Sequence, residues 1–317
     1  MRVLVTGANG FVGHALLVRA ASEKSMLWRG SVRRNAANLP GVEIVQVGDL
    51  NHATDWSAAL KGVDAVVHLA ARVHVMRDDG LQSLAAFREV NVVATERLAR
   101  AAVVHGVKRI VYVSSIKVNG EGTHLGRPYT ADDVPAPVDP YGKSKYEAEQ
   151  VLHNLASETG LGVVVIRPVL VYGPAVKGNF LSLMGWLRRG IPLPFGSISN
   201  LRSLVALDNL VDLILTCLTH PKAPGETFLV SDDEDISTSA LLRRTAAALG
   251  SSARLIPVPM QLLQTGARLL GKDQLADRLC GSLQVDIRKT RELLGWVPKV
   301  TMDTALKQTA RHFLANL

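Results

Sequence analysis

A tyrosine and a lysine at positions 141 and 145 form the pattern in this sequence that is best suited to chemistry. They lie in the run DPYGKSK (139–145), whose proline is typical of a first helical turn, so both side chains would share one helix face. A phenol with a pKa of about 10 is a poor acid–base catalyst at neutral pH, and a neighbouring ammonium lowers that pKa. Tyr141 and Lys145 therefore predict proton transfer at a substrate oxygen, although the same spacing also occurs on ordinary surface helices.

A serine adds a further hydroxyl to this pattern. The run VYVSS (111–115) predicts a strand that ends at Ser114 and Ser115. Open α/β sheets bind their ligands at the carboxyl edge of the strands, which is where these hydroxyls would lie.

Three glycines follow the first apolar run with the spacing GxxGxxG, in TGANGFVG (6–13). Gly7 would permit a tight turn, Gly10 would let backbone N–H groups approach a pyrophosphate, and Gly13 would let the next helix pack closely. The helix N-terminus adds partial positive charge for the phosphates. Because a strand precedes the glycines and a helix follows them, the loop predicts dinucleotide binding; a strand–turn–helix without a ligand is the alternative.

Two arginines bear on which dinucleotide binds. NAD-binding folds usually carry an acid about 20 residues after the loop, where it binds the ribose 2′-hydroxyl. This sequence has no Asp or Glu from 24 to 42 and places Arg33 and Arg34 there instead. Guanidinium groups pair well with a 2′-phosphate, so the sequence favours NADP(H), with NAD(H) and a merely solvated arginine pair left open.

The elements that must position these residues alternate between strands and helices. Buried strands separated by helices predict an α/β fold with a doubly wound parallel (Rossmann) sheet. We expect a dinucleotide-binding domain over 1–172 and a smaller, interleaved α/β substrate lobe over 173–317, with 205–220 returning to the first domain through a helix over 205–218. Apolar residues at helical spacing predict further helices over 84–105 and 140–158.

Composition narrows the class of protein. The 317 residues are 47% hydrophobic and 20% charged, which is ordinary for a globular chain. Cys217 and Cys280 form no CxxC pair and the nine histidines show no ligand spacing, so we expect neither a disulfide framework nor a metal site. The acidic run 232–235 is interpreted as a solvated turn.

Charge and hydropathy bear on partners and location. The net charge of +8 allows an anionic partner, but no lysine-rich tract with interleaved aromatics supports nucleic-acid binding. No stretch offers the roughly 20 apolar residues of a spanning helix, and no signal peptide is recognisable. We expect a cytoplasmic protein with no membrane or nucleic-acid partner.

Several runs together resemble the extended short-chain dehydrogenase/reductase family, that is, the NAD-dependent epimerase/dehydratase family of nucleotide-sugar enzymes. They are TGANGFVG (6–13), GDL (48–50), HLAA (68–71), NVVAT (91–95), VSS (113–115), YGKSK (141–145) and RPVLVYGP (167–174). The resemblance implies a catalytic triad of Ser115, Tyr141 and Lys145, with Ser115 preferred over Ser114 because it lies five residues before Gly120. It also implies a homodimer formed through the helices 84–105 and 140–158.

The same resemblance implies binding positions. Besides Tyr141 and Lys145, the cofactor positions are Gly7, Gly10, Phe11, Val12, Gly13, Arg33, Arg34, Asp49, Leu50, Leu69, Ala70, Ala71, Asn91, Pro168 and Val171. Substrate positions are Ser115, Lys117, Asn179 and Arg202, of which Asn179 and Arg202 resemble residues that hold the substrate phosphates. A solvated lysine, a loop asparagine and a surface arginine are the corresponding alternatives.

Departures from the family pattern favour one activity. SIKVNG (115–120) lacks the acids that a 4,6-dehydratase places after its serine, and Lys117 stands where epimerases usually carry threonine. SSIKVNGE (114–121), GSLQVD (281–286) and RELLGWVP (291–298) look most like bacterial reductases of UDP-linked 4-keto-6-deoxy-N-acetylhexosamines, which serve O-antigen and other surface-polysaccharide synthesis. We therefore expect NADPH-dependent reduction at C4; an NAD-dependent UDP-sugar 4-epimerase and a non-catalytic dinucleotide-binding regulator are the alternatives.

Overall fold

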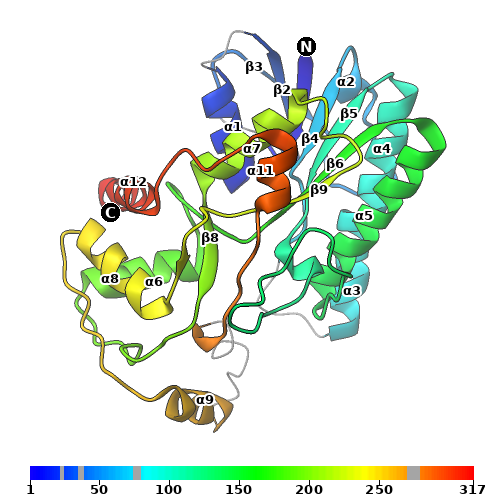
Figure 1. The fold of residues 1–317 in the computed structure, drawn as a ribbon. Helices are drawn as coiled ribbons and strands as arrows, with labels where there is room; N and C mark the ends of the chain where they lie inside the picture. Colours follow the sequence, from blue (N-terminus) through cyan, green and yellow to red (C-terminus); the bar gives the residue numbers. More distant parts are fainter. Residues whose placement is uncertain (22–24, 35–38, 74–79, 270–278) are drawn as a thin grey trace.

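Seven parallel strands form the central sheet of the protein (Figure 1). The computed structural model describes residues 1–21, 25–34, 39–73, 80–269 and 279–317. The strand order is β3-β2-β1-β4-β5-β6-β9. Their bounds are β1 Arg2–Thr6, β2 Leu27–Val32, β3 Val42–Gln46, β4 Ala65–His68, β5 Arg109–Val113, β6 Gly162–Pro168 and β9 Thr227–Val230. The predicted doubly wound parallel sheet is confirmed.

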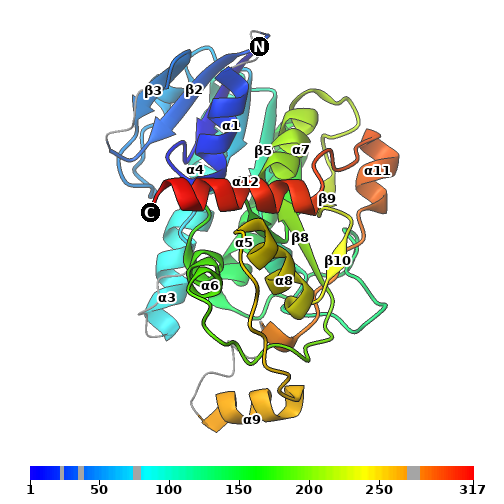
Figure 2. The ribbon, with the colours of Figure 1, turned by 90° about the vertical axis from the view of Figure 1, so that its left-hand side faces the viewer.

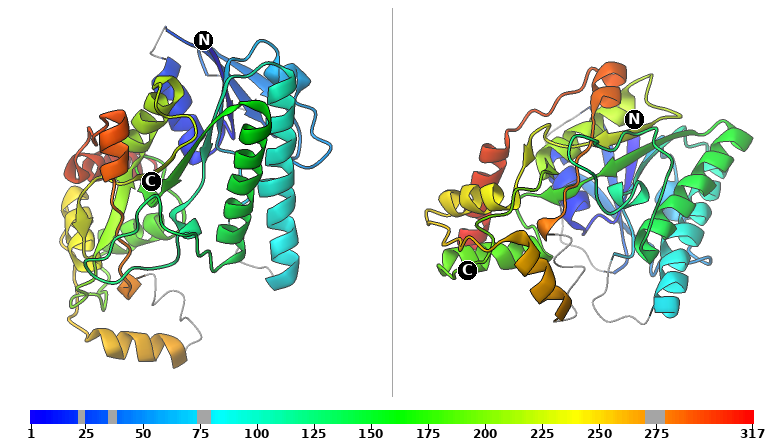
Figure 3. Two further views of the ribbon diagram at one scale, coloured as in Figure 1. Left: turned by 45° about the vertical axis from the view of Figure 1, so that its right-hand side comes forward. Right: turned by 60° about the horizontal axis from the view of Figure 1, so that its bottom comes forward.

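Helices cover both faces of this sheet, which explains why its strands are apolar on both sides. Successive residues of a strand point to opposite faces. Val3 and Val5 pack with α1 (Phe11–Ala21) and α7 (Leu207–Thr219), whereas Leu4 packs with α2 (Ser57–Leu60), α4 (Ala94–Val104) and α5 (Pro140–Thr159). Figure 3 shows α4 and α5 side by side on their face of the sheet.

The helix predicted over 84–105 is present but is interrupted. α3 (Gly80–Arg88) passes into one π-helical segment, η1 (Glu89–Val93), before α4 begins. A π-helical turn inserts an extra residue into the helix and is frequent at functional sites. Here it lies around Asn91, which is 1% exposed.

The return to the central sheet begins later than the sequence predicts. Val205 and Ala206 pair with Val171 and Tyr172, so they belong to β8 (Arg202–Ala206), and the helix α7 starts only at Leu207. The hydrogen bonds of a parallel pair with β7 (Leu170–Tyr172) hold these two residues extended. After α7, β9 pairs with β6 at the edge of the central sheet.

The smaller lobe has its own sheet and core. β10 (Asp235–Ile236), β8 and β7 form its three-stranded sheet, and α6 (Gly178–Arg188), α8 (Thr238–Ala248) and α12 (Met302–Ala315) pack with it (Figure 2). α11 (Arg288–Leu294) contacts β9, and α9 (Met260–Leu269) lies away from the rest of the lobe in Figures 1 and 2. No helix within the described part of the chain is long and apolar enough to cross a membrane.

Candidate active site

The glycine loop connects β1 to α1 in the space that the sequence predicts. Gly7 has φ +69°, and a Cβ there would lie 2.9 Å from the backbone N of Ala70. A Cβ on Gly13 would lie 2.2 Å from the carbonyl oxygen of Gly7, so the first turn of α1 packs directly on the loop. Phe11 and Val12 open this helix, and its first turn has no acidic residue. The loop therefore fits a pyrophosphate at the helix N-terminus.

The loop after β4 lies beside the glycine loop. The hydroxyl of Thr6 accepts hydrogen bonds from the backbone N–H groups of Leu69 and Ala70, at 3.1 and 3.2 Å. Leu69, Ala70 and Ala71 are all partly exposed. The predicted pyrophosphate and ribose positions thus meet at the carboxyl edge of β1 and β4, where the strand order reverses and where such sheets bind ligands.

The predicted adenine-side residues lie at the ends of β2 and β3. Arg33 and Arg34 follow β2 and are exposed, and the guanidinium Nε of Arg33 lies 3.5 Å from a carboxylate oxygen of Asp49. The side chains of Arg33 and Asp49 are 70% and 65% exposed, so a ligand can reach both. Leu50, the next residue, is partly buried. The fold therefore places a carboxylate beside the arginine that the sequence assigned to a 2′-phosphate.

Ser115 and Tyr141 meet at the carboxyl edge of β5. Ser115 caps the short helix η2 (Ile116–Val118), and its hydroxyl is hydrogen-bonded to the phenol of Tyr141 in the first turn of α5. Burial raises the pKa of Tyr141 to about 12; the Asp139 carboxylate raises it too, and the hydrogen bond to Ser115 lowers it. The phenol is thus a neutral proton donor in the free chain, and it needs added positive charge before it can act as a base.

Lys145 is buried one turn further along α5. Its Nζ donates a hydrogen bond to the carbonyl oxygen of Val113 at 2.8 Å and lies 4.1 Å from the centre of the Tyr112 ring. Burial lowers the pKa of Lys145 to about 7, and Glu149 opposes that shift. The ammonium can therefore lose its charge near neutral pH, which makes its ionisation part of the chemistry of the site.

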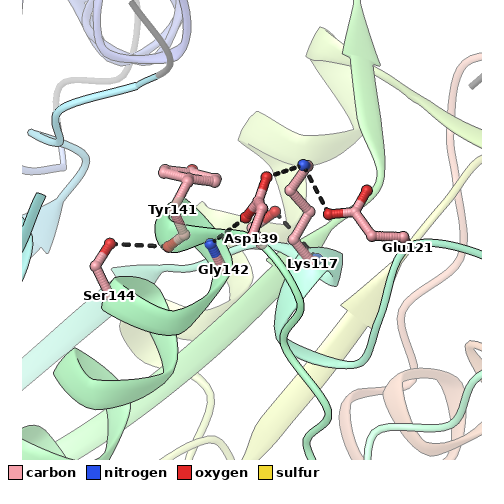
Figure 4. A network of polar contacts seen from close by, with 7 residues as sticks. Lys117, Glu121, Asp139, Tyr141, Gly142 and Ser144 are labelled. Atoms are coloured by element: carbon pink, nitrogen blue, oxygen red, sulfur yellow. Dashed lines mark hydrogen bonds and ion pairs between the residues drawn. The ribbon is translucent and has the colours of Figure 1, made fainter. Parts of the chain in front are cut away.

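Lys117 contacts the start of α5 (Figure 4). Its ammonium forms ion pairs with the carboxylate of Asp139 and, at 2.9 Å, with that of Glu121. Asp139 also caps α5 by accepting the N–H of Gly142 at 2.6 Å. A Cβ on Gly142 would lie 2.8 Å from the carbonyl oxygen of Lys117, so η2 and α5 pack backbone to backbone. In this arrangement Lys117 positions the turn that carries Tyr141.

Asn91 connects the loop after β4 to the catalytic helix. Its side-chain oxygen accepts the N–H of Arg72 at 2.8 Å, and its Nδ2 donates to the carbonyl oxygen of Arg72 at 3.1 Å and the hydroxyl of Ser144 at 2.9 Å. Ser144 in turn donates to the carbonyl oxygen of Tyr141 at 2.8 Å. The amide predicted to bind cofactor is thus engaged with protein groups, and it positions two segments of the site.

A buried histidine, to which the sequence assigns no catalytic role, extends this network. His68 lies between two hydroxyls: its Nδ1 is 2.7 Å from Thr6 Oγ1, and its Nε2 is 2.9 Å from Thr95 Oγ1. Thr95 donates to the carbonyl oxygen of Asn91 at 2.7 Å. Burial, with a smaller effect from Lys145, lowers the pKa of His68 to about 3, so the imidazole is neutral. The nearest sequence signal was a polar residue inside an otherwise apolar strand.

The remaining cofactor positions, Pro168 and Val171, and the remaining substrate positions, Asn179 and Arg202, fall on the smaller lobe and its connection. Pro168 ends β6 and Val171 lies in β7, so this segment leaves the central sheet. Asn179 is exposed in the first turn of α6. Arg202 begins β8, and its Nη1 donates to the carbonyl oxygen of Gly281 at 3.0 Å. Arg202 therefore already holds backbone of the lobe, and Asn179 is open to solvent.

The acidic run 232–235 holds segments of the smaller lobe together through hydrogen bonds and ion pairs. Asp232 accepts hydrogen bonds from the Tyr172 hydroxyl, the N–H of Ala206 and the Asn209 amide at 2.7, 2.8 and 2.7 Å. The neighbouring carboxylates of Asp233, Glu234 and Asp235 bind partners of their own. No cluster of histidine, cysteine and acidic side chains in the described ranges could hold a metal ion.

Comparisons with known proteins show the family to which the chain belongs. A family model described as the NAD dependent epimerase/dehydratase family matches residues 3–231. A Vibrio cholerae protein named UDP-glucose 4-epimerase is 49% identical over 98% of this chain and 95% of its own. An Escherichia coli O157:H7 protein named N-acetyl-alpha-D-glucosaminyl-diphospho-ditrans,octacis-undecaprenol 4-epimerase is 28% identical over 98% of this chain and 94% of its own.

Solved structures show the same fold. The UDP-glucuronic acid 4-epimerase of Bacillus cereus in complex with NAD aligns with a TM-score of 0.80 at 20% identity, covering 100% of this chain and 99% of its own. MoeE5 in complex with UDP-glucuronic acid and NAD aligns with a TM-score of 0.76 at 26% identity, and the alignment covers 100% of both chains.

Proposed function

Since the chain belongs to the NAD-dependent epimerase/dehydratase family, we propose that it interconverts the C4 epimers of a UDP-linked sugar with a retained NAD. The observation that carries this proposal is that the hydroxyls of Ser115, after β5, and Tyr141, in the first turn of α5, come together at the carboxyl edge of the sheet, where Ser115 lowers the pKa of the phenol. The names of the Vibrio cholerae and Bacillus cereus relatives support the same reaction. The proposal therefore prefers the epimerase alternative to the C4 reduction that the sequence favoured.

The residues of the site divide the work of this reaction. The chemistry that the bound cofactor supplies is hydride transfer at C4. Tyr141 takes the proton of the C4 hydroxyl as the sugar is oxidised and returns it after the keto sugar has presented its other face. Ser115 donates a hydrogen bond to the same oxygen, and Lys145 would hold the ribose of the bound cofactor. Asn179 and Arg202 face the UDP diphosphate in this assignment.

One observation favours a second candidate, the NADPH-dependent reduction of a UDP-linked 4-keto-6-deoxy-N-acetylhexosamine. Arg33 and Arg34 stand exposed after β2, where a 2′-phosphate could pair with both guanidinium groups. The Asp49 carboxylate beside Arg33 supports NAD instead, because it can accept a ribose hydroxyl and would repel a phosphate. NAD is the cofactor that we propose for the lead reaction.

Cofactor turnover separates the two candidates. Purified protein is incubated with UDP-glucose or UDP-N-acetylglucosamine without added cofactor, and the C4 configuration of the product is read by NMR. If the protein is an epimerase, we expect it to convert the UDP-sugar to its C4 epimer with no change in NAD(P)H absorbance. We expect the Tyr141→Phe variant to convert none of the UDP-sugar. If UDP-4-keto-6-deoxy-N-acetylhexosamine instead consumes NADPH mole for mole while UDP-glucose and UDP-N-acetylglucosamine stay unchanged, the epimerase reading is wrong.

We also propose a homodimer through α4 and α5. Their outer surface exposes Val104, which is 83% exposed, and a cavity of about 690 Å³ along α5 is lined by residues that include Tyr146 and His153. A second copy would cover this surface. Light scattering that gives a monomer mass for the active protein would refute the dimer.

A further inference from the structure

Two segments of the smaller lobe run side by side at its outer end. The N–H of Leu193 donates to the carbonyl oxygen of Arg254, and the N–H of Ile256 donates to that of Leu193, both at 2.8 Å. Leu193 and Leu255 pack in the core of the lobe. Because neighbours in extended backbone point to opposite sides, Arg254 and Ile256 point outward.

The outward side chains make a surface that is both apolar and basic. Trp186, Ile191, Ile256 and Met260 are 42%, 38%, 49% and 36% exposed, and Leu262 on α9 is 63% exposed. Arg189 and Arg254 are exposed among them, and a Cβ on Gly190 would lie 3.8 Å from Nε of Arg254. We call this surface the Trp186 face; it consists of Trp186, Arg189, Ile191, Arg254, Ile256 and Met260. Clustered exposed apolar groups of this kind mark an interaction site.

The charge of the same segments identifies the kind of partner. Residues 178–201 and 236–272 contain no aspartate or glutamate, and their Arg188, Arg189 and Arg254 are exposed, whereas Arg244 pairs with Glu234 and Asp303. A second copy of the chain is a poor occupant, because a two-fold contact would set arginines against arginines. A nucleic acid would match the charge but would gain little from exposed isoleucine and methionine, since its outer surface is phosphate.

We propose that the Trp186 face binds the surface of an anionic phospholipid membrane. Tryptophan lies preferentially at the membrane–water interface, aliphatic side chains enter the headgroup boundary, and arginines pair with anionic headgroups. The sequence predicts no membrane partner because it has no spanning segment. A helix or loop that lies on the membrane surface does not need a spanning segment. α9, which stands clear of the lobe, extends the face toward the bilayer (Figures 1 and 3).

Membrane binding leaves the proposed active site accessible. α6 begins beside Asn179 and ends at Arg188, and its 11 residues span about 16 Å. The face lies at the far end of this helix, so the substrate side stays open while the lobe is docked. The proposal rests on the surface alone and is independent of the reaction that the enzyme performs.

Vesicle flotation tests the proposal. The full chain is mixed with vesicles of phosphatidylcholine alone or of phosphatidylcholine with an equal share of phosphatidylglycerol, at low and high salt. We expect flotation only with phosphatidylglycerol, weakened by salt. A triple arginine variant combines Arg188→Gln, Arg189→Gln and Arg254→Gln. It should bind vesicles with phosphatidylglycerol about 100-fold more weakly than the parent, since each arginine near the membrane surface contributes about 5-fold. Trp186→Ser with Ile256→Ser should also reduce flotation.

Matched controls make the result decisive. Val134→Ser with Arg311→Gln removes one exposed apolar and one exposed basic side chain elsewhere, and this variant should float like the parent. The proposal is wrong if the parent does not float with phosphatidylglycerol, if the triple arginine variant floats as well as the parent, or if the control loses as much binding. A change in oligomeric mass in the Trp186→Ser with Ile256→Ser variant would assign the face to a second copy. Release from vesicles by single-stranded DNA at equal charge would assign it to nucleic acid.

Discussion

A buried ion pair behind the catalytic helix gives a sharp test of how the site is held. The guanidinium of Arg167 on β6 contacts the carboxylate of Glu149 on α5 through Nη2 at 2.6 Å and through Nε at 3.1 and 3.2 Å. The two side chains are only 6% and 2% exposed. Glu149→Gln keeps the shape of the side chain but leaves a buried guanidinium without its counter-charge. Such a loss costs about 3–5 kcal/mol in the free energy of unfolding.

The same helix supplies a matched control. Glu147 pairs with Arg88 at 2.5 Å, but these side chains are 29% and 51% exposed. Water and salt screen an exposed pair, so Glu147→Gln should cost about 0.2–1 kcal/mol. The two variants change the same functional group at positions two residues apart on nearly opposite sides of α5, and they differ mainly in burial.

Urea denaturation followed by circular dichroism measures both free energies, because the transition midpoint falls as stability is lost. The prediction is a much larger midpoint shift for Glu149→Gln than for Glu147→Gln. Equal shifts would refute the argument that burial makes the Arg167 pair structural. Glu149 also raises the pKa of Lys145, so Glu149→Gln should move the ionisation of Lys145 to lower pH, whereas Glu147→Gln should leave it unchanged.

Three further predictions concern the catalytic helix. Burial lowers the pKa of Lys145 from 10.5 to about 7, so between these pH values the unfolded chain binds more protons than the folded chain. The free energy of unfolding therefore rises with pH over this range. Lys145→Met should flatten that rise, as measured by urea titrations at several pH values. Ser144→Ala removes the contacts to Asn91 and to the Tyr141 carbonyl at 2.9 and 2.8 Å, so kcat should fall several-fold with little change in KM; a raised KM at constant kcat would contradict this. Asp139→Asn keeps a helix cap but removes a carboxylate that raises the pKa of Tyr141, so the pH at which the rate rises should move to lower values; a shift to higher pH would contradict the assignment.

The parts of the fold that sequence could predict are those with a local cause. The glycine loop needs small residues at fixed spacing, and the structure shows why: a Cβ on Gly13 would lie 2.2 Å from the Gly7 carbonyl oxygen. The catalytic helix was predictable because Pro140 and the Asp139 cap mark its start. The late start of α7 could not be predicted from the sequence, because Val205 and Ala206 are held in β8 by pairing with β7, which lies about 30 residues earlier in the sequence.

The parts that sequence could not predict depend on which side chains the fold brings together. The family resemblance implies Asp49 as a cofactor position, but only the fold shows that its carboxylate, which follows the next strand, lies beside Arg33. The type and position of Lys117 are compatible with a substrate contact, and only the packing of η2 on α5 places its ammonium against Asp139. His68 and Thr95 are likewise joined only when β4 packs against the start of α4.

Burial moves the pKa values of Tyr141 and Lys145, the two groups that we propose as catalytic, in opposite directions. It raises the pKa of Tyr141 to about 12 and lowers that of Lys145 to about 7, because in each case it disfavours the charged form. At pH above 7 the free site therefore holds a neutral phenol and a partly neutral amine. A unit positive charge about 4 Å away, at an effective dielectric constant of about 20, contributes roughly 4 kcal/mol, or about 3 pKa units. An oxidised nicotinamide bound beside Tyr141 would add positive charge of this kind and its reduced form would not, so the pKa of the phenol would be lower in the oxidation state that can accept a hydride.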